Sequence, residues 1–144
     1  MKKITQLFAL ALCLLLPFSA IADNHGSKAH KLVIQVSTND PKTQKIALNN
    51  AVNAQKDIGM DNIDIEIVAY GPGLSVMTAQ SPEAKRVSSL AQQGITFSAC
   101  NNTMKKMAKK SGKMPVLADG VGIVPAGVIR IMELQEKGYA YIRP

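Results

Sequence analysis

The sequence of 144 residues has no tryptophan, three phenylalanines, three tyrosines and two cysteines. Proteins that bind single-stranded nucleic acid stack bases on aromatic side chains, so this scarcity argues against a nucleic-acid partner. A formal net charge of +7 is too mild a surplus to reverse that interpretation. Because the histidines stand at His25 and His30 and none follows, a catalytic Cys–His pair is not expected in the rest of the chain.

Long apolar runs are also scarce, and the one at the amino terminus is short. Lys2 and Lys3 precede an apolar run over residues 7–16, and Ala20-Ile21-Ala22 has the small-x-small pattern that signal peptidases cleave. The run falls short of the roughly 20 apolar residues that span a bilayer, which disfavours a retained anchor. Residues 1–22 are therefore expected to be a signal peptide. The sequence predicts an exported protein of the periplasm, with no membrane span after cleavage.

Cleavage at this point changes both the charge and the thiol content of the chain. Loss of Lys2 and Lys3 lowers the formal charge from +7 to +5. Loss of Cys13 leaves Cys100 as the single thiol, which excludes an internal disulfide and a CxxC-type dithiol exchange. Residues 23–30 are polar and aperiodic and are expected to be a flexible lead-in. Residues 31–144 have the size of one domain.

No metal and no cofactor are expected. His25 and His30 lie in or beside the polar lead-in, where solvated side chains are a simpler interpretation than a metal site. Cysteine, histidine and carboxylate residues nowhere cluster with the spacing of a zinc site. The glycines of Gly120-Val121-Gly122 do not form a nucleotide-binding fingerprint.

Short apolar runs alternate with stretches of helical periodicity along residues 31–144. Strands are predicted at 32–36, 63–67, 95–97, 121–124 and 139–142. Helices are predicted from Asp40-Pro41 to Gly59, from 81 to 94, over 101–110 and over 125–137. In the second strand, acidic residues at 64 and 66 alternate with isoleucines, which predicts one wetter face. The pattern predicts a single-domain α/β fold with a largely parallel five-stranded sheet and helices on both faces, and leaves the strand order open.

Cys100 is the candidate catalytic residue. It follows a predicted strand at the start of a helix, and ligands of open α/β sheets gather at the carboxyl ends of strands. The unpaired N–H groups of a first helical turn favour a thiolate over a thiol. The alternative interpretation is a buried cysteine that packs as a small apolar residue. Neighbouring polar residues are the candidate substrate-binding side chains: Ser98, Asn101, Asn102 and Thr103.

Two further features allow two interpretations each. In the loop Tyr70-Gly71-Pro72-Gly73-Leu74, the glycines Gly71 and Gly73 either let backbone amides bind an anionic substrate or form a tight strand-to-helix turn. A group of lysines on the later turns of the helix after Cys100 is either a solvated face or a docking surface for an acidic protein or an anionic lipid headgroup. These lysines are Lys105, Lys106, Lys109, Lys110 and Lys113.

Three segments together resemble the DsrE/DsrF-like family. They are FSACNNTM at 97–104, YGPGL at 70–74, and the carboxyl-terminal part from VPAGV at 124–128 to LQEKGYAYI at 134–142. The resemblance extends from about Lys31 to Pro144. It implies a compact α/β domain that forms homotrimers or hexamers, and a persulfide carried on a cysteine after a strand, the position of Cys100. Characterised sulfur-relay members are cytoplasmic, so an exported chain represents a separate branch of the family.

Three functions follow as hypotheses. The first is a sulfur carrier that holds a persulfide on Cys100 and passes the sulfur to a partner, which would make the protein sulfurtransferase-like. The second is a non-catalytic oligomeric module that binds a small ligand or a protein, with Cys100 in a structural role. The third is a redox sensor in which Cys100 links two subunits through a disulfide.

Overall fold

The computed structural model describes residues 28–144, so the expected signal peptide and the first residues of the lead-in lie outside the described residues. The strands are β1 (His30–Val36), β2 (Ile63–Ala69), β3 (Thr96–Cys100), β4 (Val121–Val124) and β5 (Ala140–Ile142). The helices are α1 (Pro41–Ile58), the 3-10 helix η1 (Gly71–Met77), α2 (Ala84–Gln92), α3 (Asn101–Ser111) and α4 (Gly127–Glu136).

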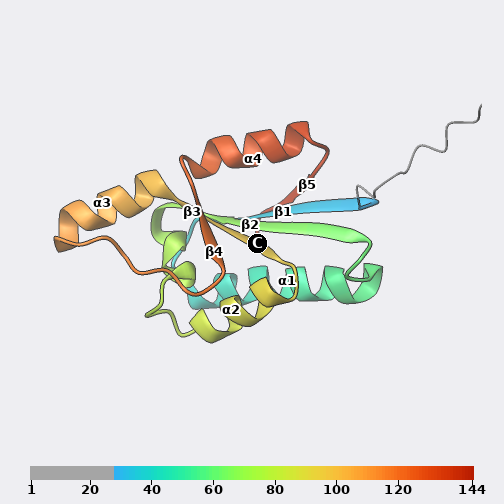
Figure 1. Ribbon diagram of the computed structural model, residues 1–144, viewed down its shortest axis with the longest axis horizontal. Coiled ribbons are helices and arrows are strands. Elements are labelled where there is room, and N and C mark those ends of the chain that lie inside the picture. Colours follow the sequence, from blue (N-terminus) through green and yellow to red (C-terminus); the bar gives the residue numbers. More distant parts are fainter. Residues whose placement is uncertain (1–27) are drawn as a thin grey trace, which may run out of the picture.

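The five strands form one parallel sheet in the order β4-β3-β2-β1-β5. The chain adds strands in one direction from β1 to β4, and α4 then returns it to the other side of β1. Helices α1 and α2 lie against one face of the sheet and α4 lies across the other (Figure 1). The α/β class, the five strands, the parallel sheet and helices on both faces are thus confirmed.

The core consists of two apolar layers, one on each side of the sheet. The larger layer joins alternate side chains of β1, β2 and β3 to α1, α2 and η1, and includes Phe97 and Leu74. The smaller layer joins Val33 and Val68 of the sheet to Ile131 and Leu134 of α4. Because α4 makes this contact nearly alone, its position depends on few apolar side chains and on the polar contacts described below.

Local signals in the sequence explain most of the observed boundaries. Asp40 caps α1, because its carboxylate accepts from the backbone N–H of Thr43 at 2.8 Å, and Pro41 occupies the first turn. Gly59 ends the same helix with a φ of 96°. Within residues 28–144, no helix combines the length and the apolar character needed to cross a membrane.

Several boundaries differ from those expected: β1 begins at His30, β2 continues to Ala69 and α4 begins at Gly127, and three further differences have a visible cause. The loop after β2 is a 3-10 helix, η1, rather than a simple turn. Helix α2 starts at Ala84, because Ser81 first closes a turn by accepting the N–H groups of Glu83 and Ala84. Strand β3 continues to Cys100, since residues 96–99 pair with β2 and residues 97–100 pair with β4.

The prediction that β2 has a wetter face is wrong at Glu66. The side chain of Asp64, near the start of the strand, is 39% exposed, whereas Glu66 is 3% exposed because α4 covers it. A buried carboxylate is costly unless it is paired. The partners of Glu66 are therefore part of how this fold holds together.

Candidate functional site

Cys100 lies where β3 ends and α3 begins. It is the last residue of the strand and the N-cap of the helix, and 5% of it is exposed. Opposite it on β4 stands Val124, three residues before the start of α4. The first turns of α3 and α4 consequently meet at the thiol. The cysteine is free, as expected for a chain with no second cysteine among residues 28–144.

Opposing effects act on the pKa of the Cys100 thiol, and the net result is a pKa below its ordinary value. Burial is the largest effect and raises the pKa, because a thiolate loses hydration there. The backbone N–H of Gly127, the hydroxyl of Thr103, and the N–H groups of Thr103 and Asn102 lower it. As hydrogen-bond donors around a sulfur at the start of α3, these groups favour the thiolate over the thiol.

Thr103 connects the thiol to the loop after β2. Its Oγ1 accepts a hydrogen bond from the backbone N–H of Gly71 at 2.9 Å. With that acceptor position occupied, its own hydrogen is free to point at the sulfur of Cys100, which is how the hydroxyl lowers the pKa of the thiol. Thr103 and Gly71 are two predicted site residues that the fold brings together.

The two glycines of the loop have different surroundings. Gly71 has a φ of 54°, in the left-handed region, and its N–H is directed at Thr103. Gly73 is buried, and a Cβ on it would lie 2.2 Å from the carbonyl oxygen of Val36. Gly73 therefore allows η1 to approach β1 closely. Its N–H donates to the carbonyl oxygen of Tyr70 and is not free to bind an anion.

A groove opens beside Thr103, between η1 and α3. Its volume is about 430 Å³. Tyr70, Pro72 and Met107 supply apolar surface, and Lys106 and Lys110 supply positive charge. Cys100 does not line this groove; Thr103 forms the wall that the groove and the thiol share.

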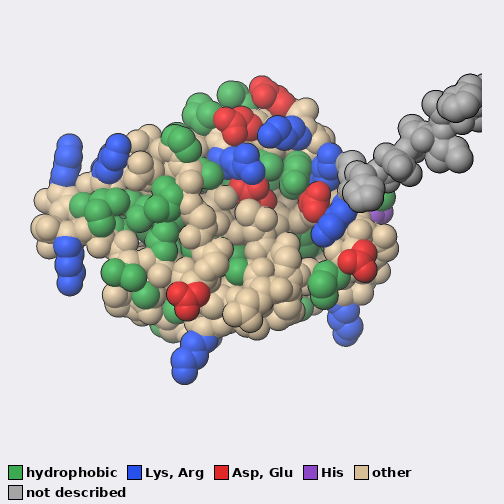
Figure 2. Space-filling model, in the orientation of Figure 1, with side chains coloured by type: hydrophobic (Ala, Val, Ile, Leu, Met, Phe, Trp, Pro, Cys, Tyr) green, Lys and Arg blue, Asp and Glu red, His purple; other side chains and the backbone are tan. Residues whose placement is uncertain are grey.

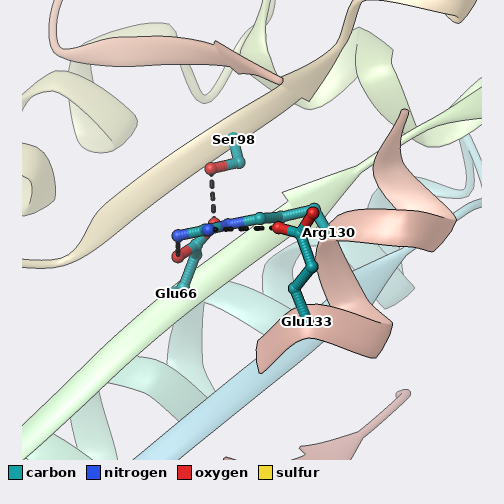
Figure 3. Close-up of polar contacts among 4 residues, drawn as sticks. All are labelled: Glu66, Ser98, Arg130 and Glu133. Atoms are coloured by element: carbon teal, nitrogen blue, oxygen red, sulfur yellow. Dashed lines mark hydrogen bonds and ion pairs between the residues drawn. The ribbon is translucent and has the colours of Figure 1, made fainter. Parts of the chain in front are cut away.

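A buried ion pair joins β2 to α4 (Figure 3). Glu66 accepts two hydrogen bonds from the guanidinium of Arg130 on α4, at 2.8 and 2.7 Å, and one from the hydroxyl of Ser98 at 2.6 Å. The carboxylate of Glu133 lies 3.6 Å from the same guanidinium at the surface. The hydrogen bond with Glu66 raises the pKa of Arg130 above its ordinary value, so the guanidinium stays charged.

The ion pair reaches the thiol through α4. Arg130 lies one turn after Gly127, whose N–H faces Cys100, and the backbone N–H of Arg130 donates to the carbonyl of Ala126. Sequence reasoning missed this cluster because Glu66 and Arg130 are 64 residues apart. One signal was available: an acidic residue in the middle of an apolar strand requires a cationic partner if a helix covers it.

The remaining predicted residues lie as follows. Ser98 is buried and its hydroxyl is committed to Glu66. Asn101 and Asn102 form the first turn of α3, where the side chain of Asn102 is exposed and its N–H is one of the donors near the sulfur. His30 is the first residue of β1. Among residues 28–144, histidine, cysteine and carboxylate side chains nowhere form a group of three that could hold a metal ion.

Family comparison agrees with this architecture. The model of the DsrE/DsrF-like family matches residues 30–144. The chain belongs to the DsrE/DsrF-like family. A solved structure of the same fold is a protein of unknown function, MTH1491 from Methanobacterium thermoautotrophicum, at 32% identity and a TM-score of 0.72, covering 80% of this chain and 99% of that one. None of the curated proteins matches the chain. The DsrE/DsrF-like family is linked in general to sulfur relay.

Proposed function

We propose that this protein carries sulfur as a persulfide on Cys100 and passes it to a partner. Membership of a family linked to sulfur relay supports this proposal. The observation that carries it is a free thiol where the first turns of α3 and α4 meet, with a pKa lowered by donors from both helices. A thiolate is the nucleophile in sulfur exchange, so a lowered pKa favours the reaction at neutral pH.

The chemistry consists of two exchanges. The Cys100 thiolate attacks the outer sulfur of a donor persulfide, R–S–SH; a new S–S bond forms, the donor S–S bond breaks, and R–S⁻ leaves. The protein then holds Cys–S–SH. An acceptor thiolate attacks the outer sulfur in the same way and regenerates the Cys100 thiolate. Each exchange conserves charge and needs no external oxidant or reductant. The donor groups of Gly127 and Thr103 would stabilise the anionic sulfur in both steps.

The proposed setting is the periplasm, supported by the pattern of residues 1–22. A thiol in an oxidising compartment is exposed to disulfide formation. Cys100 is 5% exposed, so the thiol of a folded protein reaches it less easily than a small persulfide does, which disfavours a mixed disulfide and favours a small donor or acceptor.

Self-association is a further part of the proposal. Three apolar side chains of α4, Val128, Ile129 and Met132, are about half exposed or more. An apolar surface of this kind is typical of an interface, and the expected homotrimer or hexamer would cover it. Sedimentation of the Met132→Glu chain tests this expectation: a smaller species than the wild type supports it, and a monomeric wild type would contradict it.

One observation favours the second candidate, a binding module in which Cys100 only packs. At 5% exposure, Cys100 is as inaccessible as many structural cysteines. The two functions differ in the reactivity of the thiol. A structural cysteine would react with iodoacetamide slowly, with a midpoint at or above the ordinary thiol pKa, whereas a carrier would react with a midpoint below it.

The sulfur-carrier proposal is tested by incubating the reduced protein with a small persulfide donor and determining the intact mass. We expect one added sulfur atom on the wild type, removable by a reductant. The matched control is Cys100→Ser, a substitution of similar size that, in the uncleaved chain, still contains Cys13. Equal loading of the control, or no loading of the wild type, would overturn the proposal.

A further inference from the structure

We infer that the groove between η1 and α3 binds a small, peptide-like persulfide that carries carboxylates, and that this molecule is the sulfur donor or acceptor of Cys100. The inference rests on the proposed function and deepens it by naming a substrate class. Its basis is the juxtaposition of an amphipathic groove of about 430 Å³, two lysines, and the wall residue Thr103 shared with the thiol.

Helical periodicity aligns the groove with the thiol. Residues 100, 103, 107 and 110 recur at intervals of three and four, so they follow one stripe of α3. Cys100 stands at the head of the stripe, where α3 begins. Thr103 and Met107 follow it into the groove, and Lys110 lies at the far end. A molecule lying in this groove would therefore have one end directed toward the sulfur.

The lysines of the groove favour an anionic ligand. Lys106 and Lys110 line it, and none of the residues that line it is acidic. Among residues 28–144, neither lysine forms a salt bridge with an aspartate or a glutamate. In Figure 2, cationic side chains project from the end of the molecule that α3 forms. Unpaired ammonium groups beside a concave surface attract carboxylates.

The dimensions favour a small molecule over a folded partner. At a rise of about 1.5 Å per residue, Lys106 and Lys110 lie about 9 and 15 Å along the helix axis from Cys100. An extended tripeptide spans about 10 Å, so with its sulfur near the thiol a terminal carboxylate can reach the flexible side chain of Lys106, and that of Lys110 where it leans back toward the start of α3. The volume also lies within the usual range of small-molecule sites. Tyr70, Pro72 and Met107 would contact the hydrocarbon part of the ligand.

Binding is measured by calorimetry with S-methylglutathione, a carboxylate-bearing tripeptide whose blocked sulfur cannot be transferred. We expect the wild type to bind the probe, and the Lys106→Ala/Lys110→Ala chain to bind it at least about tenfold more weakly, because each lost charge-assisted contact is worth more than a neutral one. The matched control is Lys105→Ala/Lys109→Ala. It removes the same charge from the same helix, at residues that do not line the groove, and should bind like the wild type.

The outcomes separate this inference from the proposed function. The Cys100→Ser chain should still bind the probe, since the blocked sulfur makes no covalent step. If the wild type loads sulfur yet does not bind the probe, the groove assignment is wrong and the carrier function stands. If it binds the probe but takes up no sulfur, the carrier function fails and the groove remains a binding site. If both double substitutions weaken binding of the probe equally, the inference is overturned. Such a result would indicate attraction by the overall positive charge of α3, as expected for a surface that binds an acidic protein.

Discussion

Two polar regions contact α4 one turn apart, Cys100 at Gly127 and Glu66 at Arg130, and they differ in how completely their hydrogen bonds are satisfied. Around Glu66, each carboxylate oxygen accepts at least one short hydrogen bond from Arg130 or Ser98. Around Cys100, several donors face a sulfur that makes no capping hydrogen bond. The first region already contains its anion, whereas the second is arranged for an anion that forms only when the thiol ionises.

This difference indicates that the region around Glu66 stabilises the fold and that the region around Cys100 is suited to a reaction. The buried carboxylate of Glu66, which accepts hydrogen bonds from Ser98 and Arg130 of the same chain, holds α4 on the sheet. Donors gathered around a neutral thiol gain interaction energy only when the sulfur becomes anionic, which is the condition for nucleophilic attack. Substitutions in the two regions should therefore change different measured quantities.

The largest effect is expected from Arg130→Met. It leaves the carboxylate of Glu66, which is 3% exposed, without its cation, and we expect the free energy of unfolding to fall by about 3 kcal/mol. Urea denaturation measures this change. The control is Glu133→Gln, which removes the more exposed partner of the same guanidinium at 3.6 Å and should cost less than about 0.5 kcal/mol. Similar losses for the two substitutions would contradict the assigned role of the buried pair.

A smaller loss of stability is expected from Ser98→Ala. Glu66 then loses the hydrogen bond from Ser98, while both hydrogen bonds from Arg130 remain. The free energy of unfolding should therefore fall by about 1.5 kcal/mol. Because the hydroxyl of Ser98 is committed to Glu66, the alkylation rate of Cys100 should stay at the wild-type value. A marked drop in that rate would place Ser98 in the thiol site after all.

The smallest effect, and the one most specific to the thiol, is expected from Thr103→Val. Removal of the hydroxyl raises the pKa of Cys100, so the fraction of thiolate at neutral pH falls. The rate of alkylation by iodoacetamide at pH 7 should drop about fivefold, with the midpoint of its pH profile displaced upward. Thr103→Ser keeps the hydroxyl and should restore the rate. An unchanged pH profile of alkylation in the valine variant would show that Thr103 does not lower the pKa of Cys100.

The sign of the pH dependence follows from the direction of the shift. The pKa of Cys100 is lower in the folded chain than its ordinary value. A group of this kind stabilises the fold above its unfolded pKa, and that contribution is lost as the pH falls through the folded pKa. The wild type should therefore gain stability relative to Cys100→Ser as the pH rises from 6 to 10. An opposite trend would indicate a thiol that burial keeps neutral.

Much of the fold could be predicted from the sequence because its signals are local. Asp40, Pro41 and Gly59 mark the two ends of α1, and β4 has the predicted bounds. The 3-10 helix η1 was missed because its conformation depends on contact with β1, where Gly73 packs against the backbone of Val36. The strand order could not be predicted either, since it depends on the position to which α4 connects β4 with β5.

The candidate site was predictable in part for the same reason. Cys100 could be placed from the strand and helix on either side of it, and Thr103 from its position in the same helical turn. The N–H of Gly127 could not be placed near the thiol from the sequence. It belongs to another helix and comes close to the thiol only because Cys100 pairs with Val124. The hydrogen bond from Gly71 to Thr103 likewise joins segments 32 residues apart.

A discharge experiment shows whether Cys100 both receives sulfur and transfers it to an acceptor. The reduced protein is loaded from a donor persulfide labelled with heavy sulfur, freed of donor, and mixed with a small thiol acceptor while the masses of both are followed. We expect one labelled sulfur on the wild type, its later appearance on the acceptor, and neither event with Cys100→Ser. Label that stays on the protein, or that loads equally without Cys100, would contradict this expectation.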